Sequence, residues 1–141
     1  MKFLVFVIFV SSFFIFGTAI NTQSSGAKGI LQCNSMPEAN TIIKLFDDDS
    51  GIDDDDLMGS TRSNKDGKFE ISGYEDELTP IDPKLIIYTD CNDGPKPCQR
   101  KITVKIPSIY ITSGKIAKKI YDAGVIQLSG TFPGEERDCI N

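Results

Sequence analysis

The clearest feature of the chain is a regular alternation of apolar and polar side chains in short runs. In GKFEIS, Phe69 and Ile71 share one face, while Lys68 and Glu70 share the other. Successive side chains of a β-strand point to opposite faces, so a period of two predicts a strand with one buried face. The alternation recurs along the chain and predicts an all-β protein.

Turn-forming residues separate the alternating runs, which is typical of strands joined by short connections. The expected strands are 27–33, 40–46, 67–72, 84–88, 100–106 and 121–128. Residues 84–88, KLIIY, are apolar on both faces, as in a strand that is covered on both sides. Two segments are weaker strand candidates: 73–79 fits a helical turn or a loop, and 108–120 begins with alternation but ends in residues that tolerate a helix. This series of strands indicates a two-sheet antiparallel β-sandwich.

The alternation also identifies a candidate core, because the apolar face of each strand packs against the opposite sheet. A shift of one residue in any strand would turn its whole apolar set toward solvent. The residues expected between the two sheets are Leu31, Ile43, Leu45, Phe69, Ile71, Leu85, Ile87, Ile102, Val104, Ile126 and Leu128.

The N-terminal segment, MKFLVFVIFVSSFFIFGTA, predicts export. It carries one cation, Lys2, ahead of an apolar stretch, and it ends in small residues. This order is typical of a secretory signal peptide, and the stretch is shorter than the roughly 20 apolar residues that span a bilayer. We therefore expect a signal peptide at 1–19, a flexible N-terminus at 20–26, where INTQSSG is small and polar, and one extracellular domain at 27–141. No transmembrane segment is expected.

All four cysteines, Cys33, Cys91, Cys98 and Cys139, lie in the expected mature chain, and this number predicts two disulfides in an exported protein. A zinc site is not expected, because the chain has no histidine and no Cys-x-x-Cys pair. Four cysteines allow three pairings. We favour Cys91–Cys98, because the turn CNDGPKPC brings its own ends together, which leaves Cys33–Cys139.

An acidic run extends over residues 47–56, where seven of the ten residues are aspartate. Carboxylates at this density suit calcium, but the spacing does not match the calcium-binding loop of an EF-hand. The run fits a solvated loop that its own charges keep extended. We assign no metal site and no cofactor.

The opposite charge is concentrated between Lys96 and Lys119, which hold seven cations and no acid although the chain has a net charge of −5. The candidate partner-binding residues are Lys96, Arg100, Lys101 and Lys105, which are expected to form one positive surface. Such a surface suits an anionic lipid headgroup, a glycan or an acidic protein. The alternative is an ordinary charged face that protects an edge strand. A nucleic-acid partner is not expected, because the protein is acidic, is expected to be exported and has no platform of aromatic side chains among these cations.

An ordered set of motifs, with the four cysteines in place, resembles the nematode transthyretin-like family of secreted proteins. The matching stretches are KGILQCN, KLFDDDSGIDDDDLMG, SNKDGKFEISG, IDPKLIIYTDC, DGPKPCQRKITVKIP and YDAGVIQLSGTFPGEERDC. The resemblance covers nearly all of the expected mature chain. It implies a transthyretin-like (prealbumin) sandwich and an extracellular protein without an established enzyme activity.

Catalysis is not expected. Distant relatives of transthyretin hydrolyse 5-hydroxyisourate with a histidine-rich site and a Tyr-Arg-Gly-Ser C-terminus, whereas this chain has no histidine and ends in DCIN. A serine or cysteine nucleophile would also lack the histidine that activates it. We expect a secreted recognition module that binds an anionic partner surface. The alternative is a carrier of a small hydrophobic ligand, as transthyretin is, and the oligomeric state is left open.

Overall fold

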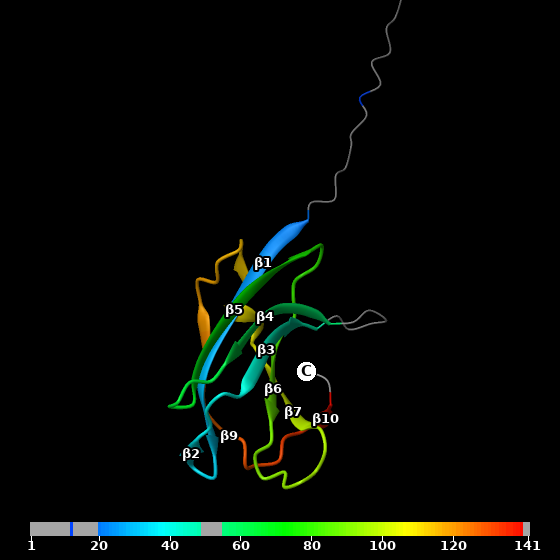
Figure 1. Cartoon of the computed structure of the whole chain (residues 1–141). Helices are drawn as coiled ribbons and strands as arrows, with labels where there is room; N and C mark the ends of the chain where they lie inside the picture. The colour runs from blue at the N-terminus through cyan, green and yellow to red at the C-terminus, as the bar shows by residue number, and fades with distance from the viewer. Residues whose placement is uncertain (1–11, 13–19, 49–54, 140–141) are drawn as a thin grey trace, which may run out of the picture.

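A computed structural model describes residue 12 and the segments 20–48 and 55–139. These residues form two β-sheets that pack face to face (Figure 1). The predicted β-sandwich is therefore confirmed. Within the described segments, no helix has the length and apolar character needed to cross a membrane. The expected signal peptide lies outside the described residues, apart from Ser12.

Each sheet contains five strands. The first sheet consists of β1 (Asn21–Cys33), β2 (Met36–Pro37), β5 (Lys68–Glu77), β8 (Thr112–Ser113) and β9 (Ile120–Gln127). The second consists of β3 (Ile42–Asp47), β4 (Asp56–Arg62), β6 (Pro83–Thr89), β7 (Gln99–Lys105) and β10 (Glu136–Asp138). A short 3-10 helix, η1 (Ser108–Tyr110), lies between β7 and β8.

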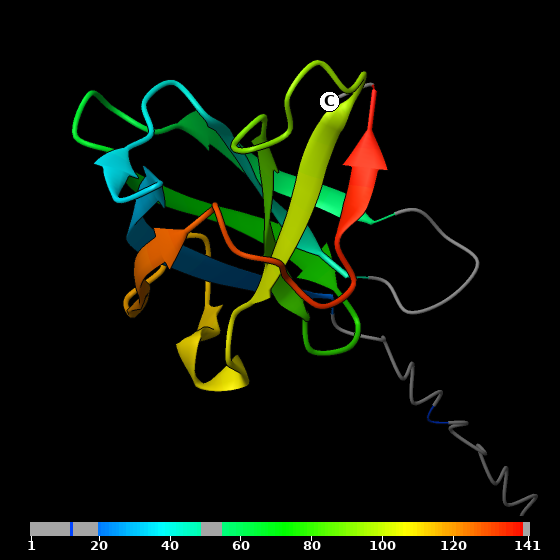
Figure 2. The ribbon, with the colours of Figure 1, turned by 90° about the horizontal axis from the view of Figure 1, so that it is seen from below.

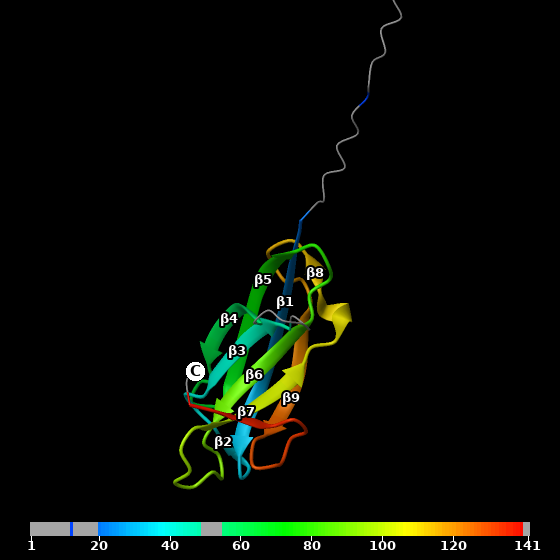
Figure 3. The ribbon, with the colours of Figure 1, turned by 90° about the vertical axis from the view of Figure 1, so that its right-hand side faces the viewer.

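Strand β1 organises the first sheet, because all the other strands of that sheet pair with it. Its pairing with β5 is antiparallel and extends from Asn21 opposite Glu77 to Ile30 opposite Lys68. Its pairing with β9 is parallel, so this sheet is not antiparallel throughout. Figure 3 shows β9 running beside β1 on the side away from β5.

The expectation of a flexible N-terminus at 20–26 is wrong, because these residues include the first half of β1. Ser24 and Ser25 are fully buried. Gln23 is buried as well: its side-chain amide donates to the carbonyl of Thr79 at 2.8 Å and accepts from the amide of Ile81 at 3.0 Å. A polar segment can form a central strand when its buried side chains are hydrogen-bonded in this way.

The other differences concern polar segments without a strong alternation. Strand β5 continues through residues 73–77, where a helical turn or a loop was expected. Strand β4 was not expected, because its sequence, DLMGSTR, has few apolar residues. It lies at the edge of its sheet, where a strand needs less apolar surface. Residues 108–120 form η1, the short strand β8 and an exposed loop instead of one regular element.

The predicted core is confirmed. Ten of the eleven expected residues are buried in one cluster between the sheets, and Val104 packs against that cluster while partly exposed. Strand β6 is buried on both faces, as its apolar sequence predicted: Ile86 and Tyr88, on the outer face, are only 1% and 4% exposed. The Lys44 ammonium lies 5.3 Å from the Tyr88 ring centroid and helps to cover this face.

The two sheets are in close contact where β4 packs against β5, and two glycines make this contact possible. A Cβ atom added to Gly73 would lie 2.1 Å from the carbonyl oxygen of Met58, and one added to Gly59 would lie 2.8 Å from that of Ser72. Both neighbours are backbone atoms, so a side chain at either position would push the strands apart.

We expect Gly73→Ala to lower the free energy of unfolding by about 1–3 kcal/mol, because the new methyl group overpacks this contact. Urea unfolding of the mature, oxidised protein measures the change. Gly130→Ala is the control, since its Cβ atom would meet only Gln127 O at 3.6 Å. Equal stability of the two variants would contradict the importance of the contact.

Candidate functional site

The expected disulfide pairing is wrong. Cys33 is bonded to Cys91, with Cα atoms 5.8 Å apart, and Cys98 is bonded to Cys139, with Cα atoms 4.2 Å apart. All four cysteines are in disulfides, as predicted. The first bond joins the end of β1 to the residues that follow β6, and it therefore links the two sheets. The second ties the 90–98 loop to the residues that follow β10.

Spacing along the chain favoured Cys91–Cys98, but the two side chains point in different directions. Cys91 continues the inward face of β6 and is only 4% exposed, so it meets the opposite sheet. Cys98 has a backbone φ of 68°, in the left-handed region. This conformation turns its side chain toward the C-terminal segment, so a tight turn alone does not determine the partners.

Asparagine follows Cys33 and Cys91, and these two asparagines reinforce the first disulfide. The Asn34 amide nitrogen donates to Asn92 Oδ1 at 2.7 Å, and the Asn92 amide nitrogen donates to Asn34 Oδ1 at 3.0 Å. Both residues have positive φ, which asparagine tolerates better than most residues. Two Cys-Asn pairs thus fasten the end of β1 to the 90–98 loop.

A carboxylate network lies beside this disulfide. Glu38 accepts hydrogen bonds from Thr41 Oγ1 at 3.0 Å and from Thr89 Oγ1 at 2.9 Å. The Glu38 carboxylate lies within 4.8 Å of the sulfur atoms of Cys33 and Cys91. These three residues do not form a metal site, because the two sulfur atoms form a disulfide and neither is available as a thiolate ligand.

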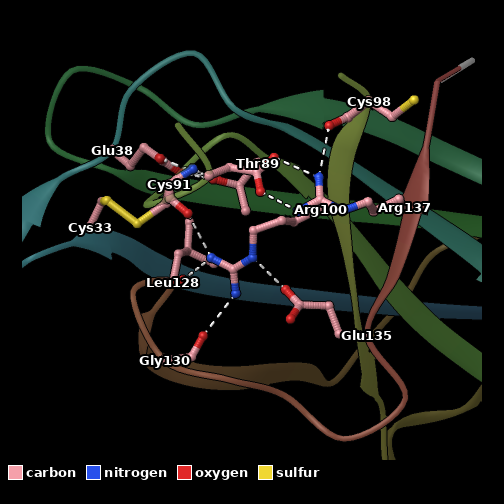
Figure 4. Close-up of polar contacts among 11 residues, drawn as sticks. Cys33, Glu38, Thr89, Cys91, Cys98, Arg100, Leu128, Gly130, Glu135 and Arg137 are labelled. Carbon is pink, nitrogen blue, oxygen red and sulfur yellow. Dashed lines mark hydrogen bonds and ion pairs between the residues drawn. A yellow bond between two sulfur atoms is a disulfide. The ribbon is translucent and has the colours of Figure 1, made fainter. Parts of the chain in front are cut away.

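Arg100 is the centre of this end of the molecule, and its expected place on a positive surface is wrong. The residue is 8% exposed. Its Nη1 donates to the carbonyls of Cys91 at 2.8 Å and Leu128 at 2.6 Å, and its Nη2 donates to that of Gly130 at 2.8 Å. Its Nε forms an ion pair with Glu135 at 2.5 Å (Figure 4). A buried arginine with this many partners has a structural role.

The sequence did contain a signal for this position. Arg100 is two residues before Ile102, so the period of two places both side chains on the inward face of β7. The sequence analysis grouped Arg100 with its charged neighbours instead of with the apolar face.

A second arginine holds the 90–98 loop against β10. Arg137 Nη1 donates to Asp93 Oδ2 at 2.8 Å, its Nη2 pairs with Asp93 Oδ1, and its Nη1 also donates to the carbonyl of Cys98 at 3.3 Å. This bidentate contact lowers the pKa of the Asp93 carboxyl below its usual range. The Cys98–Cys139 disulfide and the Arg137–Asp93 ion pair therefore both hold the 90–98 loop to the segment that contains β10.

A cleft of about 350 Å³ opens between the 90–98 loop and residues 129–137, and we call it the disulfide-end cleft. In Figure 2 the 90–98 loop lies on one side of β7, while the segment after β9 crosses β7 and continues into β10 on the other side. Arg100, Glu135 and Glu136 contribute to the lining. The other polar side chains that line it are Asn92, Asp93, Lys96, Ser129, Thr131 and Arg137.

The four candidate partner-binding residues do not form one surface. Lys96 lines the disulfide-end cleft, and Arg100 lies beneath it. Lys101 is half-buried and lies 3.9 Å from a carboxylate oxygen of Glu136. Lys105 is exposed at the far end of β7, where it is paired with Lys84 in the sheet. The linear block of cations is therefore divided in space.

The remaining cations of the block lie in one loop, residues 114–119, which we call the lysine loop. Its exposed lysines are Lys115, Lys118 and Lys119. Ile116, between them in sequence, is 80% exposed. Among the residues that the structure describes, no acidic side chain forms an ion pair with these lysines. The loop therefore presents uncompensated positive charge beside an apolar side chain.

The lysine loop is anchored to the start of β1. The amide of Gly114 donates to the carbonyl of Thr22 at 2.8 Å. The Lys115 ammonium lies 5.4 Å from the ring centroid of Tyr74, which stands on the exposed face of β5. The 90–98 loop, which forms one wall of the disulfide-end cleft, lies at the opposite end of β1, which ends at Cys33 (Figure 1).

The acidic run is not simply a solvated loop. Asp47 and Asp56 are paired at the ends of β3 and β4, while residues 49–54 lie outside the described residues. Carboxylate oxygens of Asp47, Asp56 and Glu77 lie within 4.8 Å of one another. These carboxylates could hold a hard cation or share a proton.

Asp47 is the most buried member of this carboxylate cluster, with 3% of its surface exposed. It accepts a hydrogen bond from the amide of Asp82 at 2.8 Å. Burial raises the pKa of the Asp47 carboxyl, and the charges of Asp56 and Asp82 raise it further. Nearby, Lys84 forms ion pairs with Asp55 at 2.6 Å and Asp48 at 3.5 Å, so the flanks of the run are held against β6.

Comparison with known proteins gives consistent matches. A family model described as TTR-52, transthyretin-like family, matches residues 28–107. The chain is 64% identical over 121 residues to transthyretin-like protein 5 of Caenorhabditis elegans, which covers 86% of this chain and 87% of that protein. It is 44% identical to transthyretin-like protein 33 of the same organism, over 94% of this chain and 95% of that protein. Transthyretin-like protein 2, also from C. elegans, is 44% identical over 85% of this chain and 84% of that protein.

We expect Arg100→Lys to lower the free energy of unfolding by about 3 kcal/mol or more. Lysine keeps the charge but cannot supply the fork of donors, so buried carbonyls lose their partners. Guanidinium unfolding measures the loss. The control is Arg62→Lys, because Arg62 is exposed and, within the described segments, its side chain donates one hydrogen bond, to Asn40 O. If both variants lose the same stability, the network around Arg100 is not a main support of the fold.

We expect Asp47→Asn to stabilise the protein at pH 7 and to remove part of its pH dependence. The native pKa of Asp47 is raised, so the wild type binds this proton more tightly when folded, and its stability falls as the pH rises above about 4 through the native pKa. Asparagine has no charge to bury and still accepts from the amide of Asp82. Thermal unfolding between pH 4 and pH 8 should show the largest gain at high pH. A gain that is independent of pH would contradict this assignment.

Proposed function

The chain belongs to the transthyretin-like family, and on that premise we propose that it is an extracellular binding module that engages an anionic partner surface. Family membership gives the scaffold but names no partner. Two disulfides and the signal-peptide pattern at 1–19 support secretion. We assign no catalytic residue, because a chain without histidine lacks the usual general base.

The observation that carries this proposal is the lysine loop. Three exposed lysines and the exposed Ile116 lie on one connection of a sandwich whose core is closely packed. Binding residues are commonly carried on loops that a rigid scaffold positions. The positive surface that the sequence analysis expected at Lys96, Arg100, Lys101 and Lys105 is thus reassigned to the loop between β8 and β9.

The chemistry of this loop suits a negatively charged surface. Each nearby lysine contributes about 1 kcal/mol of attraction to an anionic surface, so three contribute about 3 kcal/mol at low salt. Ile116 adds apolar contact to the charge. An anionic lipid headgroup, an acidic glycan and an acidic protein patch share this negative charge, and separate binding assays distinguish them.

The alternative of a hydrophobic carrier rests on a groove of about 420 Å³ on the outer face of the first sheet. Ile30 and Phe69 contribute to its lining, but so do the charged residues Lys28, Lys68 and Glu70. A site for an apolar molecule is usually lined mainly by apolar side chains. The groove therefore supports the carrier less well than the lysine loop supports the binding module.

We expect the double variant Lys118→Glu, Lys119→Glu to bind anionic surfaces at least about tenfold more weakly than the wild type. Sedimentation with anionic liposomes, elution from immobilised heparin and capture on an acidic protein each give one arm of the test. Raising the salt concentration should weaken binding by the wild type.

The matched control is Lys65→Glu, Lys68→Glu, which makes the same change in net charge at exposed positions near the 64–67 turn. It should bind nearly as well as the wild type. Equal binding by both double variants, or binding that does not respond to salt, would remove the lysine loop as the binding surface and favour the carrier.

A further inference from the structure

The disulfide-end cleft has a wholly polar lining. Its walls come from the 90–98 loop and from residues 129–137, and no apolar side chain contributes to it among the described residues. The hydroxyl groups of Ser129 and Thr131 and the side-chain amide of Asn92 lie along it. Such groups can both donate and accept hydrogen bonds. A cleft of this kind suits a hydroxylated ligand instead of an apolar one.

The charged side chains that line the cleft balance one another, with three cations and three carboxylates. Arg100 is paired with Glu135, and Arg137 is paired with Asp93. Glu136 lies closest to Lys101. Lys96 is exposed at the rim and has no acidic partner among the described residues. The Lys96 ammonium is therefore the charge at the cleft that is available to an anionic group of a ligand.

The two guanidinium groups also have donors to spare. A guanidinium has five N–H groups. Arg100 uses four of them, one from Nε, two from Nη1 and one from Nη2, which leaves one on Nη2. Arg137 uses three, two from Nη1 and one from Nη2, which leaves its Nε and one on Nη2. Together with the Lys96 ammonium, these N–H groups provide charged donors that an oxyanion of a ligand can accept from.

We propose that the disulfide-end cleft is a second binding site, which takes a sugar bearing one singly charged oxyanion, either a sulfate ester or a carboxylate. Lys96 and the spare N–H groups of Arg100 and Arg137 meet the oxyanion. Ser129, Thr131 and Asn92 meet the sugar hydroxyls. The site is separate from the lysine loop, since the two lie at opposite ends of β1.

The walls of the cleft are fixed before any ligand binds. The Cys33–Cys91 disulfide and the Asn34–Asn92 pair hold one side, and the Cys98–Cys139 disulfide holds the 90–98 loop to the other. A site that is already ordered loses less conformational entropy on binding. This arrangement favours measurable affinity for a single sugar unit.

The test is an NMR titration of the mature, oxidised protein with galactose 6-sulfate, sodium glucuronate and uncharged galactose at constant ionic strength. We expect saturable shifts at the cleft, with a dissociation constant on the order of 1 mM, for one or both charged sugars. The two charged probes distinguish a sulfate ester from a carboxylate. Comparable saturable binding of galactose would overturn the role of the oxyanion, and no saturation by either charged sugar would overturn the site.

Two variants test whether the sugars bind in the disulfide-end cleft or at the lysine loop. Lys96→Gln together with Thr131→Val should weaken sugar binding about tenfold or more, because a charged hydrogen bond and a hydroxyl contact are lost from exposed positions that do not support the core. The double variant Lys118→Glu, Lys119→Glu should bind these sugars like the wild type. Loss of sugar binding in the lysine-loop variant, with retention in the cleft variant, would overturn the assignment to the cleft.

Discussion

The buried guanidinium of Arg100 makes the contacts on which the disulfide-bonded end of the molecule depends. It joins the carbonyl of Cys91, which follows β6, to those of Leu128 and Gly130, which follow β9, and its ion pair reaches Glu135, just before β10. These carbonyls lie outside the hydrogen-bonded strand pairs of the two sheets. The Arg100 side chain therefore supplies the hydrogen-bond donors that a neighbouring strand would otherwise provide. Burying a charge is costly unless it is fully hydrogen-bonded. The same contacts that satisfy the arginine therefore hold the C-terminal segment against both sheets and shape the cleft.

The parts of the fold that depend on burial of apolar surface could be predicted from the sequence. Leu85 and Ile102 fall on the inward face because a period of two leaves no other choice. The parts that depend on specific polar partners could not be predicted. Ser24 and Ser25 look like tail residues until β5 and β8 lie beside them. For the same reason the sequence revealed which residues carry charge but not which charges remain exposed.

Charge that is continuous along the chain is not continuous in space. On β7 the alternation sends Arg100 inward and Lys101 outward, so the basic block is divided by the pleat of one strand. The acidic run is divided too, because Asp47 turns toward the other sheet while Asp48 and Asp55 pair with Lys84. The lysine loop and the cleft lie at opposite ends of a strand of 13 residues, or roughly 40 Å apart. Partners that bound at these two ends would therefore not overlap.

The disulfide pairing has a consequence for biosynthesis. The bonds join the first cysteine to the second and the third to the fourth, with separations of 58 and 41 residues. Synthesis proceeds from the N-terminus, so in an exported chain Cys91 would enter an oxidising compartment before Cys98 and well before Cys139. The first cysteine therefore meets its native partner as soon as any partner is available. Oxidation in the order of synthesis gives the native bonds directly, whereas a nested arrangement would require the earliest bond to wait for the last residues of the chain or to be reshuffled over seconds to hours.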